Sequence, residues 1–383
     1  MLQMFTARTN EIDEFDLAWN AIKRQIDFDA LQKNSVGLLF CTSDFLDGEV
    51  LGALCAALPF DTVGITSMAT ACTQGYGFYD LCLTVLTSDE VAFTAGVSAP
   101  LTAENYQQET KITYDALRGK VADNPVMAIT FLPYLMHTGG HQLIRALTDA
   151  TDHLPLWGAI ASSTEFTMAT VKTLFNGNVV ADCMTLLLIN GAITPRFVVT
   201  ALPEKNISTI RGLVTASNGA VISRINDLPV SEYLAYLNID INNATIRSTP
   251  FLFYFEGYNR AVVLAVYEVL PDGSLLMGGD IPVGTGVSIG GVDRNTIMQS
   301  ANDGLDEVLA MDNRNAILLL PCVTRGTMMI PEREEEIAHI YHTLKPSGTP
   351  FAMGYSGGEI SPVYAIDGLR NHFHNYTFCA CVL

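Results

Sequence analysis

Four polar residues in the last third of the chain have types that could bind or transform a small molecule. Cys322 and Arg325 follow one apolar run, and Ser356 and Glu359 follow another. Ligands of open α/β sheets tend to lie beyond the carboxyl ends of strands, where loops present backbone amides and short polar side chains. An arginine can hold a carboxylate through two parallel hydrogen bonds, and a glutamate can accept an ammonium group. Arg325 and Glu359 together would therefore suit an amino acid.

Two structural interpretations of the same residues stay open. Arg325 and Glu359 could form an ion pair with each other. Alternatively, Glu359 could cap backbone amides that Gly357 and Gly358 expose, because neither glycine has a side chain that would shield them. In either case the residues would stabilise the fold and bind no ligand.

A catalytic alternative uses a different combination. Cys322, His374 and Glu359 have the residue types of a nucleophile, a base and an orienting group. Such a set could act as a hydrolase on a small amide if the three side chains met in space.

The histidines raise the question of metal or haem binding. His372 and His374 alternate on a predicted strand, and we expect them to point to opposite faces, which argues against a shared metal ion. One of them alone could still ligate haem. His137 and His141 have the spacing of two ligands on one helical face, but the two glycines between them favour a loop that enters a helix.

The elements that must position these residues recur three times. Each copy contains an apolar run typical of a strand, a helical pattern, a second strand after a proline, and a third strand. A glycine and small hydroxyl residues follow each second strand. Three such units predict an α/β fold of mixed sheets covered by helices. The first strands are expected at 36–40, 126–131 and 316–320, and the third strands at 80–86, 181–190 and 376–383.

The stretch between the second and third copies has a different pattern. Residues 251–255 and 261–269 are typical of strands, and 271–274 of a turn before a return strand. A helix fits 297–309. The border between two halves is expected near 203–206, which gives domains 1–203 and 204–383.

Two further segments have strong local signals. Pro331 and the acidic residues that follow it, up to Glu336, suit the start of a helix. The last segment, 376–383, is so apolar and rich in β-forming residues that the chain should end inside a sheet.

Composition excludes several classes of function. The 383 residues are 49% hydrophobic and 16% charged, enough for one large core or two ordinary ones. A net charge of −19 argues against nucleic acid and anionic membrane surfaces as partners. The first residues lack the apolar stretch of a signal peptide or membrane span, so we expect a cytoplasmic protein. The eight scattered cysteines form no CxxC pair and are expected to be core residues.

Three motifs in the third copy together resemble the C-terminal half of the FIST family, and the repeated strand, helix and glycine-rich turn resemble its N-terminal half. The resemblance makes 1–203 similar to a FIST N domain and 204–383 similar to a FIST C domain. The motifs are Cys322-Val323-Thr324-Arg325, Gly358-Glu359-Ile360 with Pro362, and His374-Asn375 with Thr377.

This resemblance implies a sensory module and not an enzyme. Its ligand would be an amino acid or a similar metabolite, and its signal would pass to a separate protein such as a kinase or cyclase, because the chain has no room for an output domain. No cofactor is expected; a haem-based nitric oxide sensor is the alternative that some family members suggest. The candidate ligand-binding residues are Cys322, Arg325, Ser356, Gly357, Gly358, Glu359, His374 and Asn375.

Overall fold

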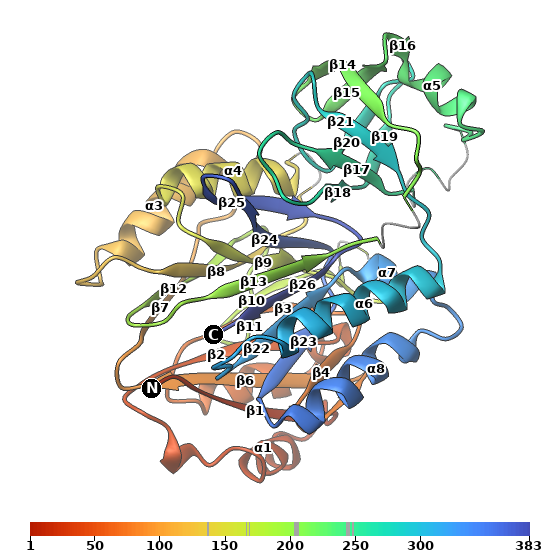
Figure 1. Cartoon of the computed structure of the whole chain (residues 1–383). Helices are drawn as coiled ribbons and strands as arrows, with labels where there is room; N and C mark the ends of the chain where they lie inside the picture. The colour runs from red at the N-terminus through yellow and green to blue at the C-terminus, as the bar shows by residue number, and fades with distance from the viewer. Residues whose placement is uncertain (136–137, 166, 168, 203–206, 243–245, 247–248) are drawn as a thin grey trace.

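The computed structural model describes residues 1–383 except 136–137, 166, 168, 203–206, 243–245 and 247–248. Its fold is the mixed α/β arrangement that the repeated strand and helix pattern predicted. Three six-stranded sheets surround a common core, and helices cover their outer faces. A fourth, antiparallel sheet projects from one end of this body (Figure 1).

The three sheets repeat one strand order, with a parallel pair near the centre and antiparallel strands on both sides. The first contains β1 (Gln3–Thr9), β6 (Leu81–Ser88), β2 (Asn34–Cys41), β3 (Thr62–Thr66), β10 (Thr173–Phe175) and β11 (Asn178–Val179). The second contains β7 (Ala92–Val97), β12 (Thr185–Asn190), β8 (Met127–Leu132), β9 (Leu156–Ile160), β24 (Gly358–Ala365) and β25 (Gly368–His374). The third contains β13 (Arg196–Thr200), β26 (Phe378–Val382), β22 (Ile317–Pro321), β23 (Phe351–Gly354), β4 (Thr70–Cys72) and β5 (Gly75–Gly77).

In each repeat, one β-hairpin pairs with the sheet of a neighbouring repeat and not with the sheet of its own. β4 and β5 pair with β23, β10 and β11 pair with β3, and β24 and β25 pair with β9. The exchange is cyclic, so none of these three sheets is built from one continuous stretch of chain. The predicted border at 203–206 lies outside the described residues, and the strands on its two sides share sheets: β13 lies beside β26, and β24 beside β9.

Alternating side chains fill two kinds of core. On β2, Leu38 and Phe40 face the core shared by the three sheets, whereas Leu39 and Cys41 face the covering helices. Strands buried on both faces are continuously apolar, which is why these runs were evident in the sequence. The covering helices are α1 (Phe15–Lys23) and α2 (Val50–Ala56), α3 (Tyr106–Arg118) and α4 (Gly140–Ala150), and α6 (Arg294–Leu309), α7 (Val323–Met328) and α8 (Glu334–Leu344).

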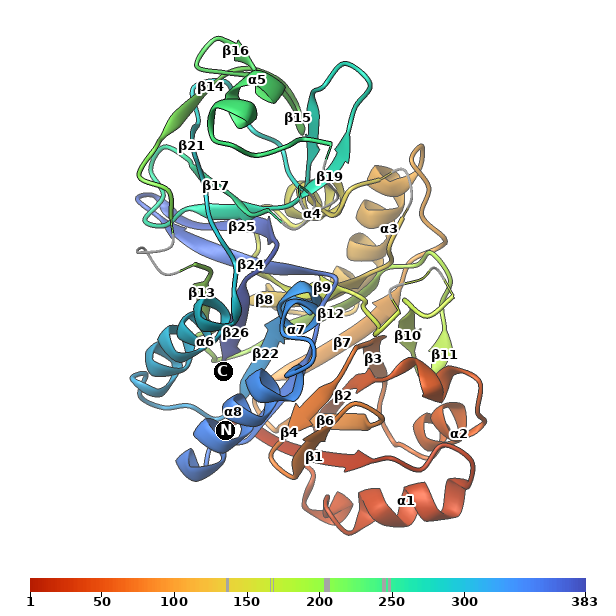
Figure 2. The same cartoon turned by 90° about the vertical axis from the view of Figure 1, so that its right-hand side faces the viewer.

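The inserted sheet lies between β13 and α6 in the chain and has its own hydrophobic core. It packs over α4 and β25 at one end of the three-sheet body (Figures 1 and 2). Its members are β14 (Gly212–Asn218), β15 (Val221–Ile225), β16 (Leu228–Pro229), β17 (Phe251–Tyr254), β18 (Val262–Leu264), β19 (Val266–Val269), β20 (Leu275–Met277) and β21 (Gly286–Ile289), with α5 (Val230–Tyr236) beside them.

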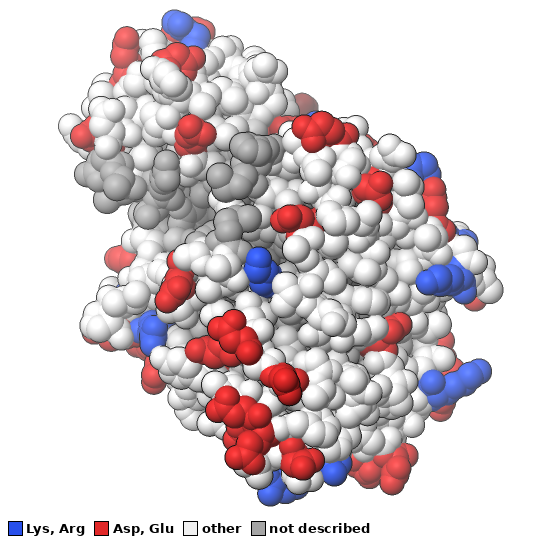
Figure 3. All heavy atoms as spheres, turned by 180° about the vertical axis from the view of Figure 1, so that it is seen from behind, with Lys and Arg blue, Asp and Glu red and all other residues white. Residues whose placement is uncertain are grey.

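Acidic residues outnumber basic ones, 40 to 21, among the charged residues of the chain. Figure 3 shows acidic side chains spread over the back of the molecule and isolated basic ones between them, as the net charge of −19 leads one to expect. No helix in the described part of the chain is both long and apolar enough to cross a bilayer.

Candidate functional site

Arg325 lies at the centre of a buried ionic cluster. Its Nε and Nη2 atoms lie 2.8 and 2.6 Å from Glu336 Oε1. Nη1 donates to Ser300 Oγ at 2.8 Å and to the Tyr376 carbonyl at 3.2 Å, and Nη2 donates to the Ile297 carbonyl at 2.9 Å. A guanidinium has five N–H groups, and these five contacts use all of them. A ligand carboxylate would therefore reach Arg325 only by displacing a partner.

The ion-pair partner of Arg325 is Glu336 on α8 and not Glu359. The interpretation that Arg325 and Glu359 pair with each other is thus wrong. Glu336 is fully buried and also accepts a hydrogen bond from Tyr355 O–H at 3.0 Å, whereas its sequence position indicated only a helix start. The role of Arg325 in ligand binding stays a prediction, but its present contacts are those of a structural group.

Glu359 belongs to a second buried cluster, with Cys322, Ser356 and Thr377. Ser356 Oγ lies 2.6 Å from Glu359 Oε1, and Thr377 Oγ1 lies 2.7 Å from Oε2. The Thr377 amide donates to Oε2 at 3.3 Å, and the Cys322 amide donates to the Thr377 carbonyl at 3.0 Å. Residues of all three motifs therefore contact one another at one place. It lies at the end of β22, the start of β24 and the residue that precedes β26.

Two glycines, Gly357 and Gly358, directly precede Glu359 in the chain. The Gly357 amide donates to the Ile160 carbonyl at 2.8 Å, so Glu359 does not cap it. At Gly358 a Cβ atom would lie 2.1 Å from the Phe373 ring, so only glycine fits. The backbone amide that Glu359 does accept is that of Thr377.

Glu359 is a neutral carboxylic acid at pH 7. Burial raises the pKa of Glu359 to about 8, and hydrogen bonds from Ser356 and Thr377 offset only part of that effect. Hydrogen-bond geometry agrees, because Ser356 Oγ also lies 3.1 Å from the Pro321 carbonyl oxygen and its one proton cannot serve two acceptors. A protonated Glu359 can donate to Ser356, which then donates to Pro321. In this form Glu359 offers no negative charge to an ammonium group.

Glutamine at position 359 is expected to remove one pH-dependent contribution to stability. The pKa of Glu359 is about 8 in the folded protein and close to its ordinary value of 4.5 when unfolded, so the folded state holds the extra proton and loses stability as pH rises toward 8. Between pH 6.5 and 8 the free energy of unfolding should fall by up to about 1.4 kcal/mol per pH unit in the native protein and less in Glu359→Gln. Urea titrations at both pH values measure this; equal slopes would show that Glu359 is ionised.

His372 and His374 lie on the same face of β25. Their ring centroids are 6.1 Å apart, so the prediction of opposite faces is wrong, because residues two apart on a strand share a face. Burial lowers the pKa of His374 to about 4 and that of His372 to about 3, so both rings are neutral at pH 7. These two groups favour the folded state as pH rises from 4 to 6.5, below the window used for Glu359.

The catalytic combination is not assembled in this structure. His374 Nε2 lies 3.1 Å from the Ser361 carbonyl oxygen, to which it donates, and not against the Cys322 thiol. Burial raises the pKa of the Cys322 thiol, which keeps it protonated and a poor nucleophile. Asn375 has a different role, because its Oδ1 accepts the Ala265 amide at 3.1 Å.

The described residues contain no group of three or more His, Cys, Asp or Glu side chains arranged around a metal position. His137 lies outside the described residues, and the loop after it enters α4 at Gly140, as its glycines predicted. Neither histidine that was a candidate haem ligand has a free ring nitrogen facing a haem-sized space: His374 is enclosed, and His372 Nε2 lies 2.9 Å from the Tyr258 hydroxyl.

Asn375 connects the buried motifs to an open cleft. Besides accepting the Ala265 amide, its side chain lies beside Tyr267, which lines the cleft: burial raises the pKa of the Tyr267 phenol, and Asn375 offsets part of that rise. The cleft has a volume of about 600 Å³ and separates α4 from the inserted sheet. It lies beyond the carboxyl ends of the parallel strands β8 and β9, where α/β proteins usually bind ligands.

The cleft presents both signs of charge. Arg145 and His141 extend from α4, and Asp280 and Glu268 extend from the inserted sheet. Asp280 contacts Arg145 Nη1 at 2.6 Å and His141 Nε2 at 3.3 Å, so it bridges the two sides. Contacts to His141 lower the pKa of Asp280 and keep it ionised.

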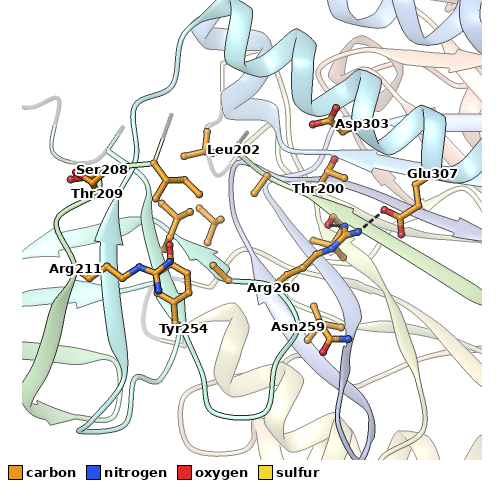
Figure 4. Close-up of a pocket in the computed structure, with 17 residues that line it drawn as sticks. Thr200, Leu202, Ser208, Thr209, Arg211, Tyr254, Asn259, Arg260, Asp303 and Glu307 are labelled. Carbon is orange, nitrogen blue, oxygen red and sulfur yellow. Dashed lines mark hydrogen bonds and ion pairs between the residues drawn. The ribbon is translucent and has the colours of Figure 1, made fainter. Parts of the chain in front are cut away.

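A larger cavity of about 720 Å³ lies where the inserted sheet joins β13 and α6 (Figure 4). Arg260 extends toward Glu307 and pairs with it at 2.7 Å, and Arg211 stacks on Tyr254 at 4.4 Å from the ring centroid. None of the candidate residues named from the sequence lines this cavity. None of them lines the cleft at α4 either, but Asn375 lies beside Tyr267, which does line that cleft, and the cleft is therefore the candidate site.

Several residues of the site had little signal in the sequence. Thr377 belongs to a recognised motif and could have been chosen. The sequence around Glu336 indicates only a helix start, and the sequence around Tyr267 only a strand. Thr138 stands between two histidines and has no signal of its own. The position of each of these residues in the site depends on contacts between segments that are far apart in the sequence.

The protein is therefore an α/β protein in which the residues of three sequence motifs are buried. A cleft large enough for a small ligand lies close to them. The FIST N domain model matches residues 35–228, and the FIST C domain model matches 229–362. The chain therefore belongs to the FIST family, whose domains are regarded as ligand-binding sensory domains of signal transduction.

No curated protein matches the chain. Among solved structures, the cyanuric acid hydrolase from A. caulinodans is similar at 11% sequence identity and a TM-score of 0.25, over 50% of this chain and 72% of that one. Similarity at this level carries no information about the function of this chain.

Proposed function

We propose that this protein is a sensor that binds a small polar metabolite, an amino acid or a similar compound, in the cleft between α4 and the inserted sheet. The signal would pass to a separate partner such as a kinase or cyclase. The observation that supports this most is the cleft itself: its volume suits a small ligand, and it lies between α4 and the inserted sheet, which Asp280 connects through Arg145 and His141. Occupancy would change how the inserted sheet sits on α4.

A ligand-binding role is favoured over hydrolysis. The thiol of Cys322 is buried and protonated, and the imidazole of His374 is bonded elsewhere. A nucleophile without a base in reach has little activity in the resting enzyme. The titratable residues that line the open cleft are an arginine, two acids, a histidine and two tyrosines, and they include no cysteine.

Free amino acids are expected to raise the melting temperature of the purified chain. Each of the common L-amino acids is added singly in millimolar excess, and thermal unfolding is followed. A ligand present at about one hundred times its Kd stabilises the native state by about 2.7 kcal/mol, which shifts the melting temperature of a protein of this size by a few degrees.

Two matched variants locate the effect. Asn218→Trp places a bulky ring at an exposed lining position of the cleft and should abolish the shift, whereas Thr209→Trp does the same in the cavity of Figure 4 and should preserve it. An unchanged melting temperature with every amino acid, or a shift lost only in Thr209→Trp, would contradict the proposal.

A further inference from the structure

We infer that the amino-terminal turn of α4, with the Thr138 hydroxyl, is a carboxylate-binding subsite of the cleft. The inference rests on the proposed function, because it names the part of the ligand that this end of the cleft would recognise. It assigns a role to the segment Thr138-Gly139-Gly140-His141, whose backbone and side chains line the cleft next to Arg145.

The first requirement of such a subsite is a source of positive potential. α4 runs from Gly140 to Ala150, and its first turn forms one wall of the cleft. The first amides of a helix have no intrahelical acceptor, and the aligned peptide dipoles place partial positive charge there. At this helix Gln142 Oε1 accepts the Gly139 amide at 2.9 Å, whereas the Gly140 and His141 amides have no acceptor among the described residues. These features suit an anion.

The second observation is independent of the helix. Thr138 is only 4% exposed, yet it lines the cleft, and within the described residues its hydroxyl has no hydrogen-bond partner. Its oxygen is not one of the described side-chain atoms that are both fully buried and without a partner, so the hydroxyl keeps access to the cleft. A hydroxyl facing a cavity beside helix amides supplies the donor that a carboxylate oxygen accepts.

The two glycines determine what packs against the start of α4. A Cβ atom at Gly140 would lie 2.6 Å from the Phe373 ring, so glycine lets α4 pack closely on β25. A Cβ at Gly139 would lie 2.6 Å from the His141 ring. The lack of a side chain at both positions therefore lets the Phe373 and His141 rings pack against the first turn of α4.

Nearby charges favour a ligand with both signs. Asp280 is paired with Arg145 and His141, so its charge is compensated and does not repel an anion at the helix. Glu268 on the opposite wall is exposed and negative. A carboxylate at α4 and an ammonium group toward Glu268 would fit an amino acid placed across the cleft.

Acetate is the probe for the subsite alone, and acetamide is its uncharged match. Each is titrated into full-length protein labelled with ¹⁵N-glycine, and the amide signals of Gly139 and Gly140 are followed, with Gly273 and Gly284 in distant turns as references. Acetate should shift the Gly140 signal saturably, and acetamide should not. Thr138→Val should weaken acetate binding about tenfold, because it removes one hydrogen bond to a charged group, and Thr209→Val should not weaken it.

The outcomes separate the subsite from the proposed function. Acetate that shifts Gly140 no more than the references, or binds Thr138→Val equally well, would overturn the subsite even if amino acids stabilise the protein. Saturable acetate binding together with no stabilisation by any amino acid would support the subsite and contradict the proposed function. Inorganic phosphate that binds more tightly than acetate, with the same dependence on Thr138, would overturn the carboxylate assignment in favour of a phosphate ester.

Discussion

Methionine in place of Arg325 is expected to lower the free energy of unfolding by about 3–5 kcal/mol. Removing the guanidinium leaves Glu336 as an unpaired charge with no exposed surface, and it leaves the Ser300 hydroxyl and the Tyr376 carbonyl without their donor. Equilibrium unfolding in urea, followed by circular dichroism, measures the loss.

An exposed ion pair provides the control. Arg260 and Glu307 form the same kind of contact, but their side chains are 53% and 35% exposed. Arg260→Met should therefore cost less than about 1 kcal/mol. A second control replaces both buried partners: Arg325→Met with Glu336→Leu should recover much of the stability, because no charge is left unpaired.

The same experiment tests the first hypothesis about Arg325. If this residue held a ligand carboxylate and its pairing with Glu336 were incidental, Arg325→Met would lose ligand stabilisation while the free protein kept its unfolding energy. A loss below about 1 kcal/mol would favour that hypothesis and contradict the structural role.

The repeats were predictable because burial on both faces leaves a plain trace in the sequence. The strands at 36–40, 126–131 and 316–320 are continuous apolar runs, and each appears as a central strand. Exchange of hairpins between repeats was not predictable. A segment such as β24 has the same local pattern whether it pairs with its own sheet or with β9, so its partner depends on the assembled core.

Some features of the candidate site were also predictable from the sequence, and others were not. The motif residues Cys322, Ser356 and Glu359 were named from the sequence, and they do meet. Their protonation and partners were not predictable, because both depend on burial that a linear pattern does not report. Glu336 illustrates this: an acidic residue in a first helical turn is usually solvated, yet here α8 turns it toward Arg325.

Removal of residues 378–383 is expected to abolish folding. β26 lies between β13 and β22 and pairs with both along its length. Its side chains enter two cores at once, since Phe378 and Val382 pack under the helices while Cys381 and Leu383 pack in the core shared by the three sheets. Truncating a single large core side chain to alanine costs about 3–5 kcal/mol, and the total stability of a domain is about 5–15 kcal/mol.

Two single substitutions show how much stability one side chain contributes, for comparison with the truncation. Phe378→Ala should lose about 3–5 kcal/mol and still fold, whereas Tyr364→Ala, an aromatic residue 48% exposed on β24, should lose less than about 1 kcal/mol. The truncated chain should be insoluble or lack a cooperative thermal transition. A soluble truncated protein that melts cooperatively would mean that β13 and β22 close the sheet without β26, and that the three repeats depend on one another less than their exchanged hairpins indicate.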